Sequence, residues 1–453
     1  MFYNCSALKH NSLMDRTEEL IVKTIDDHKN EILEFARDIY THAELGYKEF
    51  KTSEKFQNKM KELGLEIQKD LAITGAKAFI NRDRKDSFSL ALLGELDALR
   101  IPTHKYANPE TNGAHCCGHH AQLTGIVGAA IALSIPEIAD KLDGQVELFA
   151  VPAEEYGEVE FKNTLIEQGK IRYGGGKCEL LRIGAFDDID LSLAHHISEQ
   201  GNSLGSGSSN GFVSKVIKIK GKAAHAAAAP DQGINALSAV SLGLQALGLN
   251  RETFRDEDAV RVHPILTKGG ELVNVVPEQA VIETLVRGKT IEAFTDAAVK
   301  TDRSFKAGAL AIGADYRIET MPGYLPEIPQ EFPKELIEAF DELTKGNFEL
   351  TPKTTHSNGS TDVGDVQHLL PVLTFHTGGM KGGLHQDNFD IVDEDTAYIL
   401  TAKMFAIGAY RLLKDGAALG KSIKEGYTPK FKNKEEYISF MDSFNKIEEG
   451  SYK

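Results

Sequence analysis

The chain contains a short, uninterrupted apolar run, Ser89-Leu-Ala-Leu-Leu-Gly94, that limits which folds are possible. Such a run is typical of a strand that is buried on both faces, as in a parallel sheet covered by helices. A second run of this kind is Val146-Glu-Leu-Phe-Ala-Val151, and residues 121–133 between them have the pattern of an Ala- and Gly-rich helix. Shorter runs follow at 191–194 and 372–375. This alternation predicts an α/β fold with a mixed, mostly parallel sheet covered by helices.

The middle of the chain has a different pattern. Residues 213–220 alternate between apolar and polar, which predicts a half-exposed strand. The segments that follow give the order βαββαβ, which is that of a ferredoxin-like unit. They are a helix at 234–247, strands at 259–266 and 280–286, a helix at 291–312 and a strand at 316–321.

The length of 453 residues favours more than one domain, because single cores stop growing at roughly 250–300 residues. Segments of linker composition flank the βαββαβ unit. We therefore predict a larger domain made of residues 1–209 and 324–453, interrupted by a smaller inserted lid or dimerisation domain at 210–323.

Composition excludes several classes of function. The 51 basic against 67 acidic residues give a net charge of −16, and no basic stripe is present, which argues against nucleic-acid binding. No stretch approaches 18 apolar residues, so we expect no membrane span. Four cysteines are too few for a disulfide framework, and the first residues lack a signal-peptide pattern, so we expect a cytoplasmic protein.

Polar side chains follow the end of each predicted strand of the larger sheet. Because ligands collect beyond the carboxyl ends of parallel strands, we expect these side chains to lie together. They combine thiol, imidazole and carboxylate, a donor set that Zn²⁺ selects first, or Mn²⁺ where carboxylates and water dominate. The residues are Glu95 and Asp97, Glu154 and Glu155, His195 and His196, His376 and His385, and the run His115-Cys-Cys-Gly-His119-His120.

Each of these signals has a simpler interpretation when it is taken alone. Cys117-Gly-His119 can be a polar loop before a helix, although its glycine lets the backbone turn both side chains toward one point. Adjacent glutamates are usually solvated, and single histidines usually lie in loops. The preceding strand, however, places Glu154 and Glu155 where one can bind a metal ion while the other acts as a base. Their combination at four strand ends favours a catalytic metal site.

Seven motifs occur together over most of the chain and are specific in combination. They are Gly94-Glu-Leu-Asp-Ala-Leu99, His115-Cys-Cys-Gly-His119, Pro152-Ala-Glu-Glu155, Gly221-Lys-Ala-Ala-His225, Asn274-Val-Val-Pro277, Ser360-Thr-Asp-Val-Gly-Asp365 and Gly383-Leu-His385. With them the chain resembles the aminoacylase/carboxypeptidase-type metallopeptidase family, in the amidohydrolase branch of hippurate, auxin-conjugate and aminobenzoyl-glutamate hydrolases. The resemblance implies a metal-dependent amidohydrolase with the metallopeptidase-type sheet.

Carried over to this sequence, the resemblance implies a site with two divalent metal ions per subunit, Zn²⁺ or Mn²⁺, and Glu154 as the general base. The inserted domain would form a homodimer, in which His225 reaches an active site, often across the dimer, to stabilise the oxyanion. Asn274 and Arg287 would bind the carboxylate of the substrate. The simpler interpretations of these last three are a loop histidine, a turn asparagine and a surface arginine. The implied metal ligands are Cys117, His119, Glu155, His196 and His385.

The sequence leaves the roles of several residues undecided. The register set by Asp187-Asp-Ile-Asp190 favours His196 over His195 as the ligand. The commoner motif of the branch has an aspartate where this chain has His120, which moves it toward the aminobenzoyl-glutamate hydrolase and dipeptidase-like subgroup. His120 could be a further metal or substrate contact. The segment 160–176 is longer than the family norm and could be a specificity loop.

The expected function is hydrolysis of the amide bond in an N-acyl amino acid or an aminoacyl- or aminobenzoyl-glutamate-like conjugate, through attack by metal-bound water. One alternative is a dipeptidase or carboxypeptidase of the same fold that acts on free-amine dipeptides, although the sequence shows no clear acidic anchor for the amine. Another is a metal-poor homologue with a binding or regulatory role. A structural zinc site is disfavoured, because such sites usually use local Cys and His ligands.

Overall fold

The larger sheet brings the predicted strands together as neighbours. In the computed structural model, which describes residues 14–452, this sheet has the order β1-β2-β6-β3-β7-β17-β8-β15. Its strands are β1 (Glu66–Leu71), β2 (Gly75–Ile80), β3 (Ser89–Glu95), β6 (Gln145–Val151), β7 (Leu191–Ile197), β8 (Ser203–Leu204), β15 (Glu349–Leu350) and β17 (Val372–Thr377). β3 runs parallel to β6 and β7, and β17 runs parallel to β7, whereas β2 is antiparallel to β1 and β6. The predicted mixed, mostly parallel sheet is confirmed.

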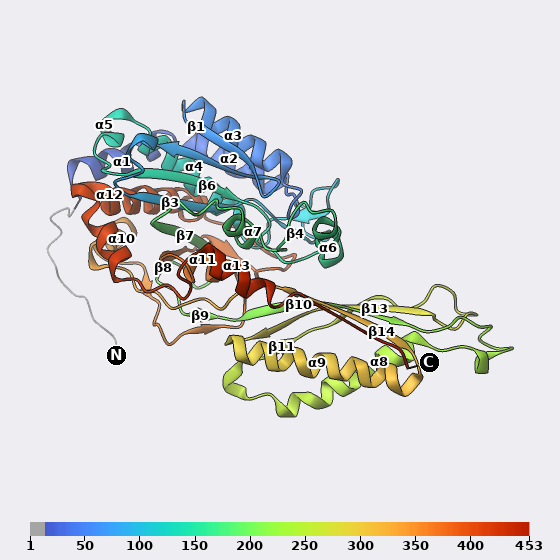
Figure 1. The fold of residues 1–453 in the computed structure, drawn as a ribbon. Helices are drawn as coiled ribbons and strands as arrows, with labels where there is room; N and C mark the ends of the chain where they lie inside the picture. Colours follow the sequence, from blue (N-terminus) through green and yellow to red (C-terminus); the bar gives the residue numbers. More distant parts are fainter. Residues whose placement is uncertain (1–13, 453) are drawn as a thin grey trace.

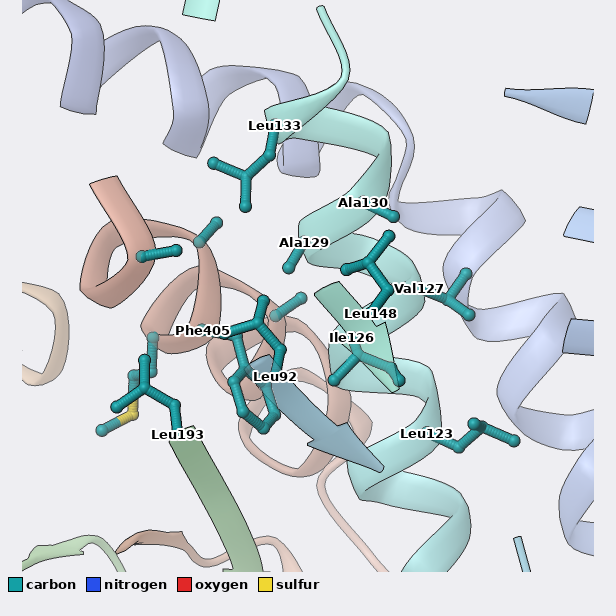
Figure 2. Close-up of a cluster of buried hydrophobic side chains, with 14 of the residues drawn as sticks. Leu92, Leu123, Ile126, Val127, Ala129, Ala130, Leu133, Leu148, Leu193 and Phe405 are labelled. Atoms are coloured by element: carbon teal, nitrogen blue, oxygen red, sulfur yellow. The ribbon is translucent and has the colours of Figure 1, made fainter. Parts of the chain in front are cut away.

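Both faces of this sheet are covered, because successive residues of β3 face two different hydrophobic clusters. Leu92 packs in the first cluster with α4 (His119–Leu133), and its neighbour Leu93 packs in the second with α7 (Gly176–Arg182). Figure 2 shows the first cluster, in which Phe405 lies near Leu92. The continuous apolar run of β3 thus reflects burial on both sides.

The helix α4 is buried along its whole length. Gly125 and Gly128 let α12 (Thr401–Gly426) pack closely, since a Cβ at either glycine would come within 2.5 Å of a side-chain carbon of α12. The helices α1 (Arg16–Asp27) and α2 (Lys29–Thr41) also contact α4. This packing fixes the first turn of α4 beneath the carboxyl ends of the strands.

A second sheet and two helices form the small unit. Its strands β10 (Gly211–Lys220), β11 (Arg261–Val262), β12 (Ile265–Lys268), β13 (Gln279–Gly288) and β14 (Asp315–Pro322) pair antiparallel, and its helices are α8 (Ala236–Asn250) and α9 (Ile291–Ile312). Figure 1 shows both helices on one face of this sheet, below the larger sheet. The element order agrees with the predicted βαββαβ pattern. The predicted domain boundaries at 209/210 and 323/324 stay a prediction.

The prediction of one strand at 259–266 is wrong in one respect, because the structure has two separate short strands there, β11 and β12. Pro264 lies between them. A proline has no N–H group to donate to a neighbouring strand, which explains the interruption.

The last part of the chain joins both sheets. The helix α13 (Lys434–Asp442) buries Tyr437 completely in the second cluster, and β20 (Lys446–Gly450) pairs with β14 as an additional strand of the small unit. The sequence predicted only a solvated helix or arm here. The strand was missed because its residues are mostly charged and largely exposed.

The remaining elements are short or peripheral. The helices are α3 (Phe50–Glu62), α5 (Pro136–Ala139), α6 (Val159–Glu167), α10 (Lys334–Thr344) and α11 (Val363–Gln367), and the strand pairs are β4 (Leu99–Arg100) with β5 (Gly113–Ala114), β9 (Ser208–Ser209) with β16 (His356–Ser357), and β18 (Met380–Lys381) with β19 (Asp390–Ile391). Among residues 14–452, no helix combines the length and the apolar character needed to cross a membrane.

Candidate metal centre

Cys117 lies at the centre of the predicted metal ligands. Its Sγ is 3.3 Å from Nε2 of His196 and 3.3 Å from Nε2 of His385. It forms one three-residue group with His119 and His196 and a second with Glu155 and His385, and within each group the ligand atoms lie within 4.8 Å of one another. The structure therefore brings all five predicted ligands into two adjacent groups that share one thiol.

Gly118 makes this arrangement possible. It has a φ of +85° and directly precedes the first residue of α4, His119. A Cβ at this glycine would lie 2.2 Å from Cγ2 of Ile197. The left-handed backbone and the close approach of Ile197 both require glycine, as the sequence predicted for the turn between Cys117 and His119.

Asp97 positions two of the predicted ligands at once. Its Oδ1 is 3.1 Å from Nδ1 of His119, and its Oδ2 accepts a hydrogen bond of 2.8 Å from the backbone N–H of Glu155. Burial alone would raise the pKa of Asp97, but the hydrogen bond and the charge of His119 hold it below its usual range. A carboxylate behind a histidine fixes the ring so that its other nitrogen is free for a metal ion.

The free nitrogens fit a divalent cation. Nε2 of His119 is buried without a hydrogen bond and lies 3.2 Å from Glu95 and 3.8 Å from Glu154. Nδ1 of His196 lies 2.7 Å from the carbonyl oxygen of Ile197, so its Nε2 is left to face Cys117. Burial raises the pKa of the Cys117 thiol well above its usual range, and a cation would be needed to stabilise the thiolate.

Glu154 lies in the same cluster, on the side of His119. Burial, and next the charges of Glu95 and Glu155, raise the pKa of Glu154 well above its usual range. The preceding residue, Ala153, has a φ of +48°, and its N–H donates to a carboxylate oxygen of Glu49. This strained turn directs the two adjacent glutamates to different parts of the cluster, as the strand-end position predicted.

A buried lysine next to the cluster was not predicted. Nζ of Lys177 lies 2.5 Å from Oε1 of Glu95 and 2.6 Å from Oδ1 of Asp362. The glycines before it are required, since a Cβ at Gly176 would lie 1.6 Å from the carbonyl oxygen of Pro152. In the sequence, the motif 360–365, which contains Asp362, was the only indication of this ion pair. The motif was identified, but no role was assigned to Asp362.

The cluster opens into one large cavity of about 840 Å³. Among the residues that line it are Glu154, four of the five predicted ligands and Arg287. The guanidinium of Arg287 lies 5.7 Å from the ring centre of Phe212. A cavity of this size suits a small organic substrate, and Arg287 is placed where it can reach one.

Two predicted residues do not reach this cavity in one chain. His225 and Asn274 are exposed, and neither lines the cavity. They lie near each other, because the N–H of Ala226 donates to the carbonyl oxygen of Asn274. Their roles stay predictions that need a second chain.

The positions left open by the sequence can now be placed. His120 is buried, with Nε2 3.0 Å from the hydroxyl of Tyr398, and His195 is buried, with Nε2 2.8 Å from the hydroxyl of Thr377. Residues 160–176 do not line the cavity, but Lys162 donates a hydrogen bond of 2.6 Å to the carbonyl oxygen of Glu155. This segment therefore supports the backbone of the cluster.

Comparison with known proteins decides the family. Residues 91–406 match the model of the peptidase family M20/M25/M40, which is more than half of the chain. The chain belongs to this family. The resemblance inferred from the seven motifs is thereby confirmed. The M20/M25/M40 match includes β10 to β14 of the small unit and most strands of the larger sheet, but not β1 and β2.

Related M20-family sequences differ in what they act on. The chain is 30% identical over 266 residues to the Xaa-Arg dipeptidase of Mus musculus, which covers 57% of this chain and 56% of that protein. It is 29% identical over 315 residues to a p-aminobenzoyl-glutamate hydrolase chain of Escherichia coli, which covers 68% of this chain and 60% of that protein. The matches thus span less than two thirds of these relatives.

Solved structures agree on the fold. A dinuclear metal-binding peptidase of the M20 family from Bacillus subtilis superposes with a TM-score of 0.59 at 22% identity, covering 86% of this chain and 99% of that one. An aminobenzoyl-glutamate utilization protein from Klebsiella pneumoniae superposes with a TM-score of 0.61 at 18% identity, covering 87% and 99%. At these identities, the likeness establishes the M20 fold alone.

Proposed function

We propose that this M20-family chain is a metal-dependent hydrolase that cleaves the amide bond of N-acyl amino acids or of aminoacyl- or aminobenzoyl-glutamate-like conjugates. The observation that carries the proposal is the thiol of Cys117, shared by two groups of ligands at the base of a cavity that also contains Glu154. Two metal ions, Zn²⁺ or Mn²⁺, fit this donor set. The ligands are Cys117, His119, Glu155, His196 and His385.

The side chains of the cavity have separate roles in this proposal. When bound, the metal ions would polarise the substrate carbonyl and lower the pKa of water. Glu154 accepts a proton from the attacking water and then gives it to the leaving nitrogen. Arg287, which lines the same cavity, binds the carboxylate of the substrate. The side chain of Asp97 keeps His119 and Glu155 in place.

A homodimer would complete the site. His225 and Asn274 are exposed on the small unit, next to Leu272 and Val273, whose exposed fractions are 64% and 104%. Apolar side chains this exposed are typical of a surface that another chain covers. We infer that the small units pair, and that His225 from one chain stabilises the oxyanion in the other while Asn274 binds substrate. The cytoplasmic location stays a prediction.

A second candidate is hydrolysis of dipeptides with a free amine. It is favoured by Glu327, a carboxylate that lines the same cavity and that the sequence did not single out. The similarity to a dipeptidase of Mus musculus is compatible with it.

The proposed function is tested by preparing the protein without metal and then loading it with Zn²⁺ or Mn²⁺. Hydrolysis of acetyl-leucine, aminobenzoyl-glutamate and glycyl-leucine is followed by release of the amine. We expect cleavage only after loading. A protein that takes up metal but cleaves none of these amides would contradict the proposed substrates, and one that takes up no metal would support the binding or regulatory homologue.

A further inference from the structure

The cavity continues beyond the metal ligands along a polar wall. Ser206, Glu327 and Ser360 line this wall. The Oγ atoms of Ser206 and Ser360 are buried and make no hydrogen bond within the described chain, and Ser206 as a whole is only 6% exposed. Buried hydroxyls are normally hydrogen-bonded, so their free state in a cavity wall indicates a place where a polar ligand binds.

Glu327 is the carboxylate of this wall. Among residues 14–452 it forms no direct ion pair, but a hydrogen bond with Ser209 and the nearby charge of Lys177 act on its carboxylate. The cavity has two basic side chains, of which Lys177 is held by Glu95 and Asp362, while Arg287 lies over Phe212. Burial raises the pKa of Glu327 to about 7. A cation brought by a ligand would stabilise the charged form of such a carboxylate.

The backbone around Glu327 is held in place on both sides. Before it, the hydroxyl of Tyr324 donates to the carbonyl oxygen of Glu154. After it, the N–H of Ile328 donates to Oε1 of Gln367 at 2.8 Å. The segment is therefore tied directly to the backbone of the proposed base, which fixes the carboxylate relative to the reacting amide.

We propose that Glu327 is a specificity residue that binds a cationic group of the substrate. The inference rests on the proposed function and adds to it the class of substrate. With Arg287 available for a carboxylate in the same cavity, the preferred amide carries both a carboxylate and an ammonium or guanidinium group. That cation can come from the free amine of a dipeptide or from the side chain of a basic amino acid.

Two matched pairs of substrates separate these sources. Glycyl-leucine and acetyl-leucine differ by one ammonium group on the acyl side, and Nα-acetyl-lysine and Nα-acetyl-norleucine differ by one on the leaving side. In the metal-loaded wild type we expect kcat/KM to be higher for the charged member of one pair. In Glu327→Gln that preference should fall by about 10- to 100-fold, as expected for loss of a charged hydrogen bond. If the preference falls for the first pair, Glu327 binds the free amine of the acyl side. If it falls for the second pair, Glu327 binds the basic side chain of the leaving amino acid.

Glu349→Gln is the matched control, because Glu349 lines the same cavity but is exposed. It should leave both preferences unchanged. A wild type that prefers the neutral member of both pairs would overturn the inference without any variant, as would a preference that Glu327→Gln keeps. If none of the four amides is cleaved, the proposed function fails instead. Binding of glycyl-leucine and acetyl-leucine, measured by calorimetry on the loaded wild type and Glu327→Gln, then still decides the role of Glu327.

Discussion

The ammonium of Lys177 lies 2.5 Å from Oε1 of Glu95, and both side chains are buried beside the candidate metal centre. Asp362 contacts the same ammonium at 2.6 Å. The ammonium of Lys177 thus stabilises the charged forms of both carboxylates, which burial would otherwise disfavour. Because Glu95 in turn lies 3.2 Å from His119, this ion pair connects α7 to the predicted metal ligands.

Lys177→Met tests this connection. The change removes the ammonium that holds two buried carboxylates, so we expect the free energy of unfolding to fall by about 3–5 kcal/mol. Urea denaturation of the metal-free protein measures it. Lys170→Met, at an exposed position, is the control and should change stability by no more than about 0.5 kcal/mol. Equal effects of the two variants would contradict the structural role of Lys177.

Glu154→Gln tests the base. The amide cannot accept a proton, so kcat should fall by about 10²–10⁴-fold. Metal content, measured by elemental analysis, should stay at the wild-type level, because Glu154 is not among the five proposed ligands. Activity near that of the wild type at unchanged metal content would refute the assignment.

The role of His225 across a dimer can be tested by mixing two inactive variants. In a mixed dimer of Glu154→Gln and His225→Ala, one of the two sites has an intact base and an intact histidine. Random exchange at equal amounts should therefore restore about one quarter of the wild-type activity in a twofold-symmetric dimer. No recovery, although the two variants exchange chains, would show that His225 does not act in the partner's site.

The stability of the protein should depend on Asp365 and on pH. Burial raises the pKa of Asp365 to about 8, whereas an unfolded aspartate has a pKa of about 3.9. The folded state therefore binds a proton that the unfolded chain releases, and the contribution of Asp365 to stability is lost as the pH rises from about 4 to about 8. Asp365→Asn removes this dependence.

The free energies of unfolding of Asp365→Asn and the wild type should be compared at pH values of about 5 and about 8. The free energy of unfolding of Asp365→Asn, relative to that of the wild type, should be larger at the higher pH than at the lower pH. Asp83→Asn, at an exposed position, serves as the control. A difference that stays constant or moves the other way would contradict the assignment.

Much of the fold could be predicted because its signals are local. The apolar run of β3 reflects the burial of that strand on both faces. The half-exposed strand predicted from the alternation at 213–220 is wrong in its exposure, because β10 is buried except at Lys218 and Lys220, and Lys215 is buried in an ion pair with Asp302. The clustering of the predicted ligands around Cys117 could be anticipated because parallel strands end at the same edge of a sheet. The family resemblance supplied their roles, which the residues alone left open.

What could not be predicted depends on contacts between distant segments. Lys177 and Asp362 are 185 residues apart, and a lysine is seldom buried. Glu327 belongs to a proline-rich linker pattern, in which nothing indicates that its side chain lines the cavity. The strand β20 has a charged, exposed sequence, and only its pairing with β14 reveals it.

The metal content of cysteine variants decides whether two metal sites share the thiol of Cys117. Elemental analysis should compare the wild type with Cys117→Ala and with Cys116→Ala, since Cys116 is an adjacent buried cysteine outside all three candidate ligand groups. We expect two ions per chain in the wild type and in Cys116→Ala, and fewer than one in Cys117→Ala, with all three proteins folded. Two ions retained by folded Cys117→Ala would contradict this expectation.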